Sequence, residues 1–222
     1  MTPKEVRELA KATCCWLAYK DLTGFGKMLS EATLSLPISE FLTTRTSWML
    51  HSELYYRKLP GAANYKLPEF SCDFAGTRKG GKEDVQFILE AKYLKVKAEN
   101  MRGPIASDFV RLALPEGKTL KRYFLLAGES QHFPPSNANF LFDKTLFGMG
   151  INNGYYIQPA KEITKPHLSK LLSSFDGDGT DTGKVSIPKS AYVTCRAVEE
   201  NDGQHERKFR VMIWSIGLAK AD

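Results

Sequence analysis

The sequence predicts an α/β protein with a mixed central sheet flanked by helices. Three observations carry this prediction: helical spacing of apolar residues near the N-terminus, two alternating segments around a Gly-Gly pair, and a helical pattern followed by a continuous apolar run. The chain has 222 residues, of which 42% are hydrophobic, and this is enough for one well-formed core. We therefore expect a single domain over residues 1–222.

Two helices are expected before the first hairpin. Residues 3–21 form the first, because apolar residues from Val6 to Leu17 recur at helical spacing and Pro3 suits a first turn. The segment 46–59, "TSWMLHSELYYRKL", predicts a second helix that ends at Pro60-Gly61. Glu53 falls on the flank of its apolar side, from which it could reach over the edge of a covered sheet.

A β-hairpin is expected around "TRKGGKED". If Gly80 and Gly81 form the turn, apolar residues face one another on one side of the hairpin: Phe74 with Phe87, Cys72 with Leu89 and Phe70 with Ala91. The same alternation places Asp73, Glu90 and Lys92 together on the opposite side. Charges in a strand core are costly to desolvate, so these three require mutual pairing or a metal ion.

The segment after the hairpin predicts a βαβ crossover. Gly103-Pro104 opens a helix that ends before Pro115, with an apolar stripe of Ile105, Phe109, Leu112 and Ala113. Residues 122–128, "RYFLLAG", form a continuous apolar run typical of a buried parallel strand. A C-terminal elaboration over about 155–222 carries a second hairpin that turns near Asn201, which we expect at a sheet edge or in a flanking subdomain.

Composition restricts partners and location. The chain has 31 Lys and Arg against 25 Asp and Glu, and this net charge of +6 favours polyanionic partners. Its four cysteines lack the spacing of a zinc site or disulfide framework, so we expect reduced thiols. No apolar run reaches membrane-spanning length and the first residues carry charges throughout, so we expect a cytoplasmic protein without membrane contact.

Asp73 followed by Glu90-Ala91-Lys92 resembles the motif of the PD-(D/E)XK nuclease superfamily. The resemblance covers a core of about 46–128, in the family's order of helix, hairpin, helix and strand. Cys72 stands where the motif has proline. A competing alignment uses Pro68-Glu69 as the first element, but Asp73 lies closer to Glu90 in the expected register.

The resemblance implies a restriction-endonuclease-like fold and a metal-dependent endonuclease of the restriction, defence or repair type. Asp73, Glu90 and the Ala91 carbonyl would hold Mg²⁺ or Mn²⁺, Lys92 would orient or deprotonate a water, and Glu53 would assist at the metal. The substrate would be DNA, although these residues do not distinguish DNA from RNA. Cleavage of both strands would favour a homodimer.

Basic side chains near the motif are candidates for phosphate contacts, although a solvated turn and strand exit explain them equally well. They are Arg78, Lys79, Lys82, Lys95, Lys97 and Arg102. Two alternatives to an enzyme remain open. One is a non-catalytic nucleic-acid-binding or scaffold protein that retains the nuclease fold. The other is a partner-binding module in which the three charges form a structural ion network.

Overall fold

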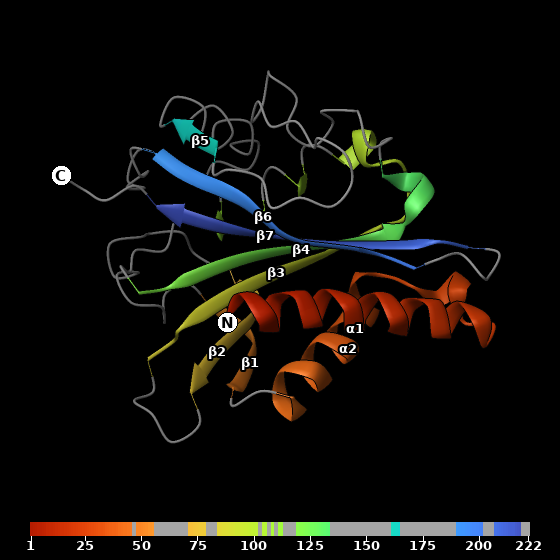
Figure 1. The fold of residues 1–222 in the computed structure, drawn as a ribbon, viewed down its shortest axis with the longest axis horizontal. Helices are drawn as coiled ribbons and strands as arrows, with labels where there is room; N and C mark the ends of the chain where they lie inside the picture. Colours follow the sequence, from red (N-terminus) through yellow and green to blue (C-terminus); the bar gives the residue numbers. More distant parts are fainter. Residues whose placement is uncertain are drawn as a thin grey trace.

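The computed structural model describes the following residues: 1–45, 48–55, 71–78, 84–101, 104–105, 108, 111–112, 119–133, 161–164, 190–201 and 207–218. Within them an α/β architecture is present, in which a mixed sheet is flanked by helices (Figure 1). The expected turn at Gly80-Gly81 lies outside the described residues. Among the described helices, none is both long and apolar enough to cross a membrane.

Two long helices precede the sheet. Helix α1 spans Pro3–Leu22 and begins with a capping box between Thr2 and Glu5, which confirms the helix predicted at 3–21. The short 3-10 helix η1, Gly26–Met28, leads into α2, Glu31–Thr44, which was not predicted. Two further 3-10 helices are η4, Ala98–Met101, and η5, Ser130–His132.

Over the described residues, the sheet has seven strands in the order β1-β2-β3-β4-β7-β6-β5. Their bounds are Trp48–Tyr55 (β1), Ser71–Arg78 (β2), Phe87–Leu94 (β3), Lys121–Glu129 (β4), Lys161–Thr164 (β5), Ser190–Glu200 (β6) and Phe209–Leu218 (β7). Strands β3 and β4 are parallel and every other recorded pair is antiparallel. The predicted mixed sheet and its crossover between β3 and β4 are confirmed.

The helix predicted at 46–59 is wrong, because the described part of that segment is strand β1. Trp48 and Leu50, two residues apart, both pack on the core cluster, whereas Ser52, which a helix would place on the same side as Trp48, is exposed. A spacing of two is that of a strand. The aromatic residues of this segment fit both periods, and pairing with β2 selects the strand.

The predicted hairpin register is wrong by two residues. Phe74 pairs with Leu89 and Gly76 pairs with Phe87, so Phe87 does not face Phe74. A Cβ on Gly76 would lie 2.0 Å from Cε1 of Phe87, which means that the ring occupies the space a side chain would fill. Because the shift is an even number of residues, every side chain stays on the face that the sequence predicted.

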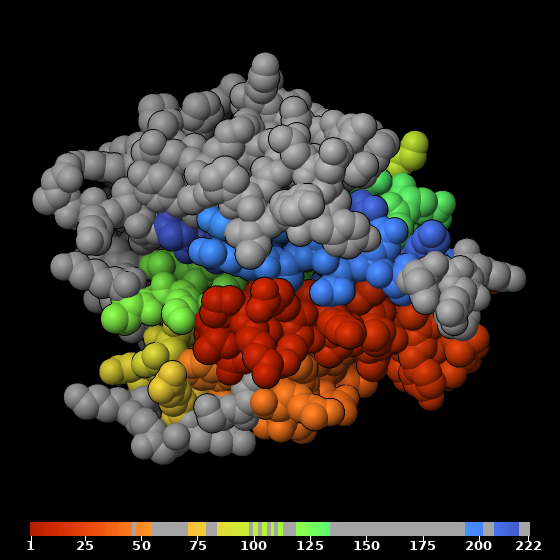
Figure 2. Space-filling model, viewed as in Figure 1, coloured from red at the N-terminus to blue at the C-terminus, as the bar shows by residue number. Residues whose placement is uncertain are grey.

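Helices α1 and α2 cover one face of the sheet. Figure 1 shows both beneath the strands, and Figure 2 shows the surface of α1 directly against that of β6. Leu9, Leu34, Leu89 and Leu125 are fully buried in the core cluster on this side. On the other face, the rings of Phe124 and Trp214 pack with their centroids 5.9 Å apart.

The C-terminal hairpin is confirmed as an antiparallel pair of β6 and β7, but its expected place is wrong. Strand β7 lies inside the sheet between β4 and β6, with Arg122 opposite Ile216 at one end and Glu129 opposite Phe209 at the other. The hairpin therefore continues the central sheet. Because β7 is buried on both faces, it contributes to the same core as β4.

Candidate functional site

Asp73 inserts its side chain between β2 and β3. The recorded pairing of these strands runs from Gly76 opposite Phe87 to Phe74 opposite Leu89, so the next position of β2, Asp73, comes beside Glu90. The backbone N–H of Ala91 donates to Oδ2 of Asp73 at 2.7 Å. The carboxylate of Asp73 therefore accepts a hydrogen bond from the backbone of β3, just beyond the pair of Phe74 with Leu89.

Asp73 and Glu90 form a pair of carboxyl groups, of which the first is half-buried and the second is buried. Glu90 is only 3% exposed. Burial raises the pKa of Asp73, and the nearby charges of Glu31 and Asp108 raise it further, against hydrogen bonds from Ala91 and Glu90 that lower it. Two carboxyl groups in hydrogen-bond contact share a proton unless a cation neutralises them. This pair is therefore a place where a divalent ion could displace a proton.

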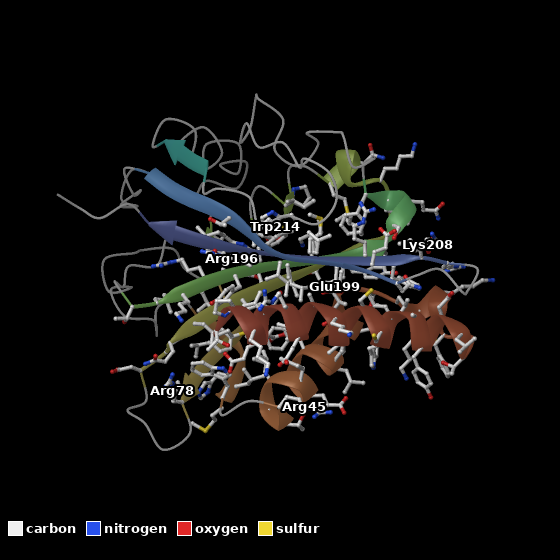
Figure 3. The ribbon with its side chains drawn as sticks, in the orientation of Figure 1. Arg45, Arg78, Arg196, Glu199, Lys208 and Trp214 are labelled. Atoms are coloured by element: carbon white, nitrogen blue, oxygen red, sulfur yellow. The ribbon has the colours of Figure 1, made fainter. Side chains whose placement is uncertain are left out.

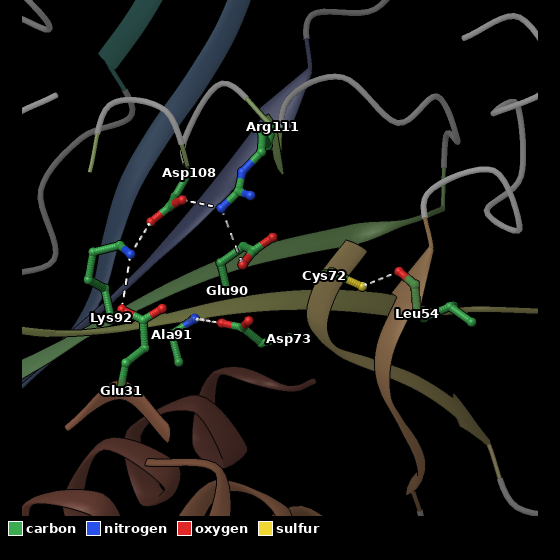
Figure 4. A network of polar contacts seen from close by, with 9 residues as sticks. All are labelled: Glu31, Leu54, Cys72, Asp73, Glu90, Ala91, Lys92, Asp108 and Arg111. Atoms are coloured by element: carbon green, nitrogen blue, oxygen red, sulfur yellow. Dashed lines mark hydrogen bonds and ion pairs between the residues drawn. The ribbon is translucent and has the colours of Figure 1, made fainter. Parts of the chain in front are cut away.

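Lys92 is held by two acids from different elements. Its Nζ lies 3.0 Å from Oε2 of Glu31 at the start of α2, and 3.1 Å from Oδ2 of Asp108 (Figure 4). Burial lowers the pKa of Lys92, but the charges of Asp108 and Glu31 outweigh burial and raise it. Lys92 is therefore an ammonium ion, which suits the expected role of orienting a water better than that of deprotonating it.

Asp108 and Arg111 come from the crossover segment, which we define as the described helical positions 104, 105, 108, 111 and 112 between β3 and β4. Oδ1 of Asp108 accepts from Nη2 of Arg111. The same Nη2 lies 3.9 Å from Oε2 of Glu90 (Figure 4). Ion pairs thus link the side chains from Glu31, through Lys92, Asp108 and Arg111, to Glu90.

The site carries more acid than base. Its members are Glu31, Asp73, Glu90, Asp108, Lys92 and Arg111; fully ionised, four carboxylates and two cations give a formal charge of −2. A divalent cation would neutralise this excess. Mg²⁺ binds through one or two carboxylates and keeps several waters, so Asp73 and Glu90 form a sufficient protein donor set.

The proposed ion would need only two side-chain ligands, the carboxylates of Asp73 and Glu90. In the described part of the chain, no group of three or more His, Cys, Asp or Glu residues is arranged to hold a metal ion. The Ala91 carbonyl, a backbone oxygen, is the remaining donor expected from the sequence. The residues present therefore fit Mg²⁺ or Mn²⁺ with water and phosphate ligands, and they do not fit a closed protein cage.

Glu53 lies on β1 rather than on a helix. Its neighbours Ser52 and Leu54 face Phe74 and Cys72, so the register places Glu53 beside Asp73 on the adjacent strand. Its backbone has φ of +50° and its side chain is exposed. The helical acid near the site is instead Glu31, which contacts Lys92 directly.

The sequence analysis did not identify three residues of the site: Glu31, Asp108 and Arg111. The sequence does hold a signal for the two acids. Ser30 and Thr33 form a capping box, and Leu34, Ile38, Phe41 and Leu42 follow at helical spacing, but Pro37 interrupts the pattern. Asp108 sits within the expected stripe, between Ile105 and Leu112, which are 1% and 0% exposed. An acid in a buried stripe predicts a buried ionic partner.

The candidate phosphate-binding residues divide by position. Lys95 and Lys97 are exposed just beyond the end of β3 that carries Lys92. Arg78 ends β2 five residues from Asp73, about 16 Å along the strand, and packs on the Trp48 ring at the left end of the sheet in Figure 3. Lys79, Lys82, Arg102 and the alternative Pro68-Glu69 lie outside the described residues.

Comparison with known proteins gives no relative: no family model, curated protein or solved structure matches this chain.

Proposed function

We propose that this chain is a metal-dependent nuclease with a restriction-endonuclease-like fold, which hydrolyses phosphodiester bonds in DNA. One observation carries the proposal: the half-buried carboxyl group of Asp73 and the buried one of Glu90, on adjacent strands, are in contact, with Lys92 two residues further on. This is the acid, acid and lysine arrangement of the PD-(D/E)XK superfamily, which the chain resembles in its motif.

Each side chain has a distinct role in this proposal. Asp73, Glu90 and the Ala91 carbonyl would hold Mg²⁺ or Mn²⁺, and the ion would supply an activated water and offset charge on the phosphate. Lys92, fixed by Glu31 and Asp108, donates hydrogen bonds to the attacking water or to a phosphate oxygen. Glu53, beside Asp73 on β1, would assist with a ligand water.

The proposed substrate is a nucleic acid backbone, which the net charge of +6 favours. Lys95 and Lys97, exposed at the site end of β3, would contact phosphates beside the bond that is cut. Residues 1–222 would act as one domain. Because two strands of a duplex run in opposite directions, a homodimer would cut both.

A second candidate follows from the ion pairs. Lys92 and Glu90 already have partners in Asp108 and Arg111, so the same side chains could serve a structural network. The chain would then be a non-catalytic nucleic-acid-binding or scaffold protein with a nuclease-like fold. Metal dependence separates the candidates, because a structural network needs no divalent ion.

Plasmid digestion tests the proposal. Purified protein is incubated with supercoiled plasmid in EDTA, Mg²⁺ or Mn²⁺, beside Lys92→Ala and Asp73→Asn and with single-stranded DNA and RNA as further substrates. We expect cleavage by the wild type with metal only, and at least a 100-fold lower rate for each variant. Wild type that leaves all substrates intact, or variants that cut as fast as the wild type, would contradict the proposal.

A further inference from the structure

We propose that Arg111 is a further phosphate-binding residue of the site: its guanidinium contacts an oxygen of the substrate phosphate, and Asp108 is the positioning residue that holds it there. This inference rests on the proposed nuclease function and adds to it a residue outside the acid, acid and lysine motif. The charged group would come from the crossover segment, which the motif does not include.

The first support is the position of the guanidinium. Nη2 of Arg111 lies 3.9 Å from Oε2 of Glu90, one of the two carboxylates that would hold the metal. An ion bound to Glu90 would place its phosphate ligand within reach of the same guanidinium. Arginine offers a planar fork of donors that matches two phosphate oxygens, which lysine does not.

The second support is accessibility. The side chain of Arg111 is 26% exposed, whereas those of its partners Glu90 and Asp108 are 4% and 6% exposed. Lys92, the other cation, is 13% exposed. Arg111 is therefore the most exposed cation of the cluster, and an incoming polyanion meets it first.

The third support is the way in which Asp108 is shared. One oxygen of this buried carboxylate contacts Nζ of Lys92 at 3.1 Å, and the other accepts from Arg111. A single acid thus fixes both cations, and it holds Arg111 beside Glu90. Because apolar residues of similar volume often stabilise a buried position as well as an ion pair does, such a network is weak evidence for a purely structural role.

The inference predicts opposite effects on metal binding and on catalysis. Replacing Arg111 with Met keeps an unbranched apolar stem but removes the guanidinium and its positive charge beside Glu90. Mn²⁺ should then bind about 3- to 10-fold more tightly, because the ion no longer competes with a nearby cation. The ratio kcat/KM should fall about 10- to 100-fold, because a phosphate contact is lost.

The test measures Mn²⁺ affinity by calorimetry and kcat/KM on a DNA duplex for wild type, Arg111→Met and Arg111→Lys. Arg111→Lys should restore wild-type Mn²⁺ affinity but only part of kcat/KM, because the charge returns without the fork. Arg210→Met is the matched control: Arg210 pairs with Glu200 at 2.6 Å, its side chain is 23% exposed, and it lies outside the cluster. This control should change neither quantity.

Each outcome decides the inference. Cleavage by Arg111→Met at the wild-type rate overturns it and leaves the proposed function standing. Parallel loss of Mn²⁺ binding and cleavage overturns it as well, because Arg111 would then only hold the site together. A folded wild type that neither binds Mn²⁺ nor cuts DNA ends the proposed function, and the inference with it.

Discussion

The metal-free site should be a source of instability that either a divalent ion or a single amide substitution relieves. Asp73 contributes a half-buried carboxyl group beside the buried Glu90 in a cluster of formal charge −2. Asp73→Asn removes one negative charge. Its amide keeps an oxygen to accept from Ala91 and gains an N–H₂ donor for Glu90. The variant should therefore be more stable than the wild type in EDTA.

The expected magnitudes follow from the size of the chain and from mass action. Relief of the buried charge should be worth about 1 kcal/mol, which raises Tm by roughly 2–4 °C for a chain of this size. Mn²⁺ at about 100 times its dissociation constant should stabilise the wild type by about 2.7 kcal/mol, or roughly 5–11 °C. Asp73→Asn should respond by less than about 1 °C, because it lacks one of the two carboxylates.

The pH dependence has a definite sign. Because the pKa of Asp73 is raised in the folded protein, the fold binds this proton more tightly than the unfolded chain does. Its contribution to stability is complete below the ordinary aspartate pKa of about 4 and is lost as pH rises through the raised value. In EDTA, the advantage of Asp73→Asn over the wild type should therefore grow with pH and then level off.

Differential scanning fluorimetry of both proteins in EDTA and in Mn²⁺, across pH, measures these shifts. Asn201→Ala is a useful control, because it removes a contact between the end of β6 and the start of β7 without touching the site: Oδ1 of Asn201 accepts from the backbone N–H of Phe209. It should lower Tm and keep the Mn²⁺ response. Equal Mn²⁺ shifts in wild type and Asp73→Asn, or none in either, would refute the reasoning.

Four further outcomes are expected. Gly76→Val should lower the free energy of unfolding by about 1–3 kcal/mol in urea titrations, because its Cβ meets the Phe87 ring. Combined with Phe87→Ala, it should cost less than the sum of the two single losses, and additive losses would contradict the packing. Lys92→Met should lower the free energy of unfolding by about 1–3 kcal/mol, because Asp108 and Glu31 lose their shared cation. An unchanged urea midpoint would argue against those ion pairs. Glu31→Gln should slow plasmid cleavage more than Glu53→Gln, since Glu31 contacts Lys92 and Glu53 is exposed; the reverse order would favour the acid on β1. Ellman's reagent should modify the exposed Cys15 quickly and the buried Cys14, Cys72 and Cys195 slowly. Burial also raises the pKa of Cys14 and Cys195 to about 12, which disfavours the reactive thiolate. Several fast thiols would contradict this packing.

Much of the sheet could be predicted because local patterns determine it. The alternation around Asp73 and Glu90 assigned both strands and the faces of their side chains, and the apolar run at 122–128 identified the parallel strand β4. The predicted faces of these side chains are correct despite the register error, because a side chain changes face only when the shift is an odd number of residues. The register itself depends on Phe87 covering Gly76, a cross-strand contact that no local pattern encodes.

The rest of the site could not be predicted because it depends on contacts between distant segments. Glu31 lies 61 residues from Lys92 in the sequence, on a helix whose pattern Pro37 interrupts. Segment 46–59 has aromatic and apolar residues that fit both periods, and only pairing with β2 makes it a strand. The sequence pattern therefore pointed to Glu53 as the helical acid of the site. In the structure the helical acid is Glu31, which begins α2 and contacts Lys92.

The most direct measurement is the location of the ion itself. Crystals of the protein grown with Mn²⁺ would give an anomalous difference map recorded near the manganese absorption edge. The account predicts a peak between the carboxylates of Asp73 and Glu90, about 2.1 Å from an oxygen of each, and no peak there in Asp73→Asn. A wild-type map without a peak between these two residues, at Mn²⁺ concentrations that support cleavage, would contradict it.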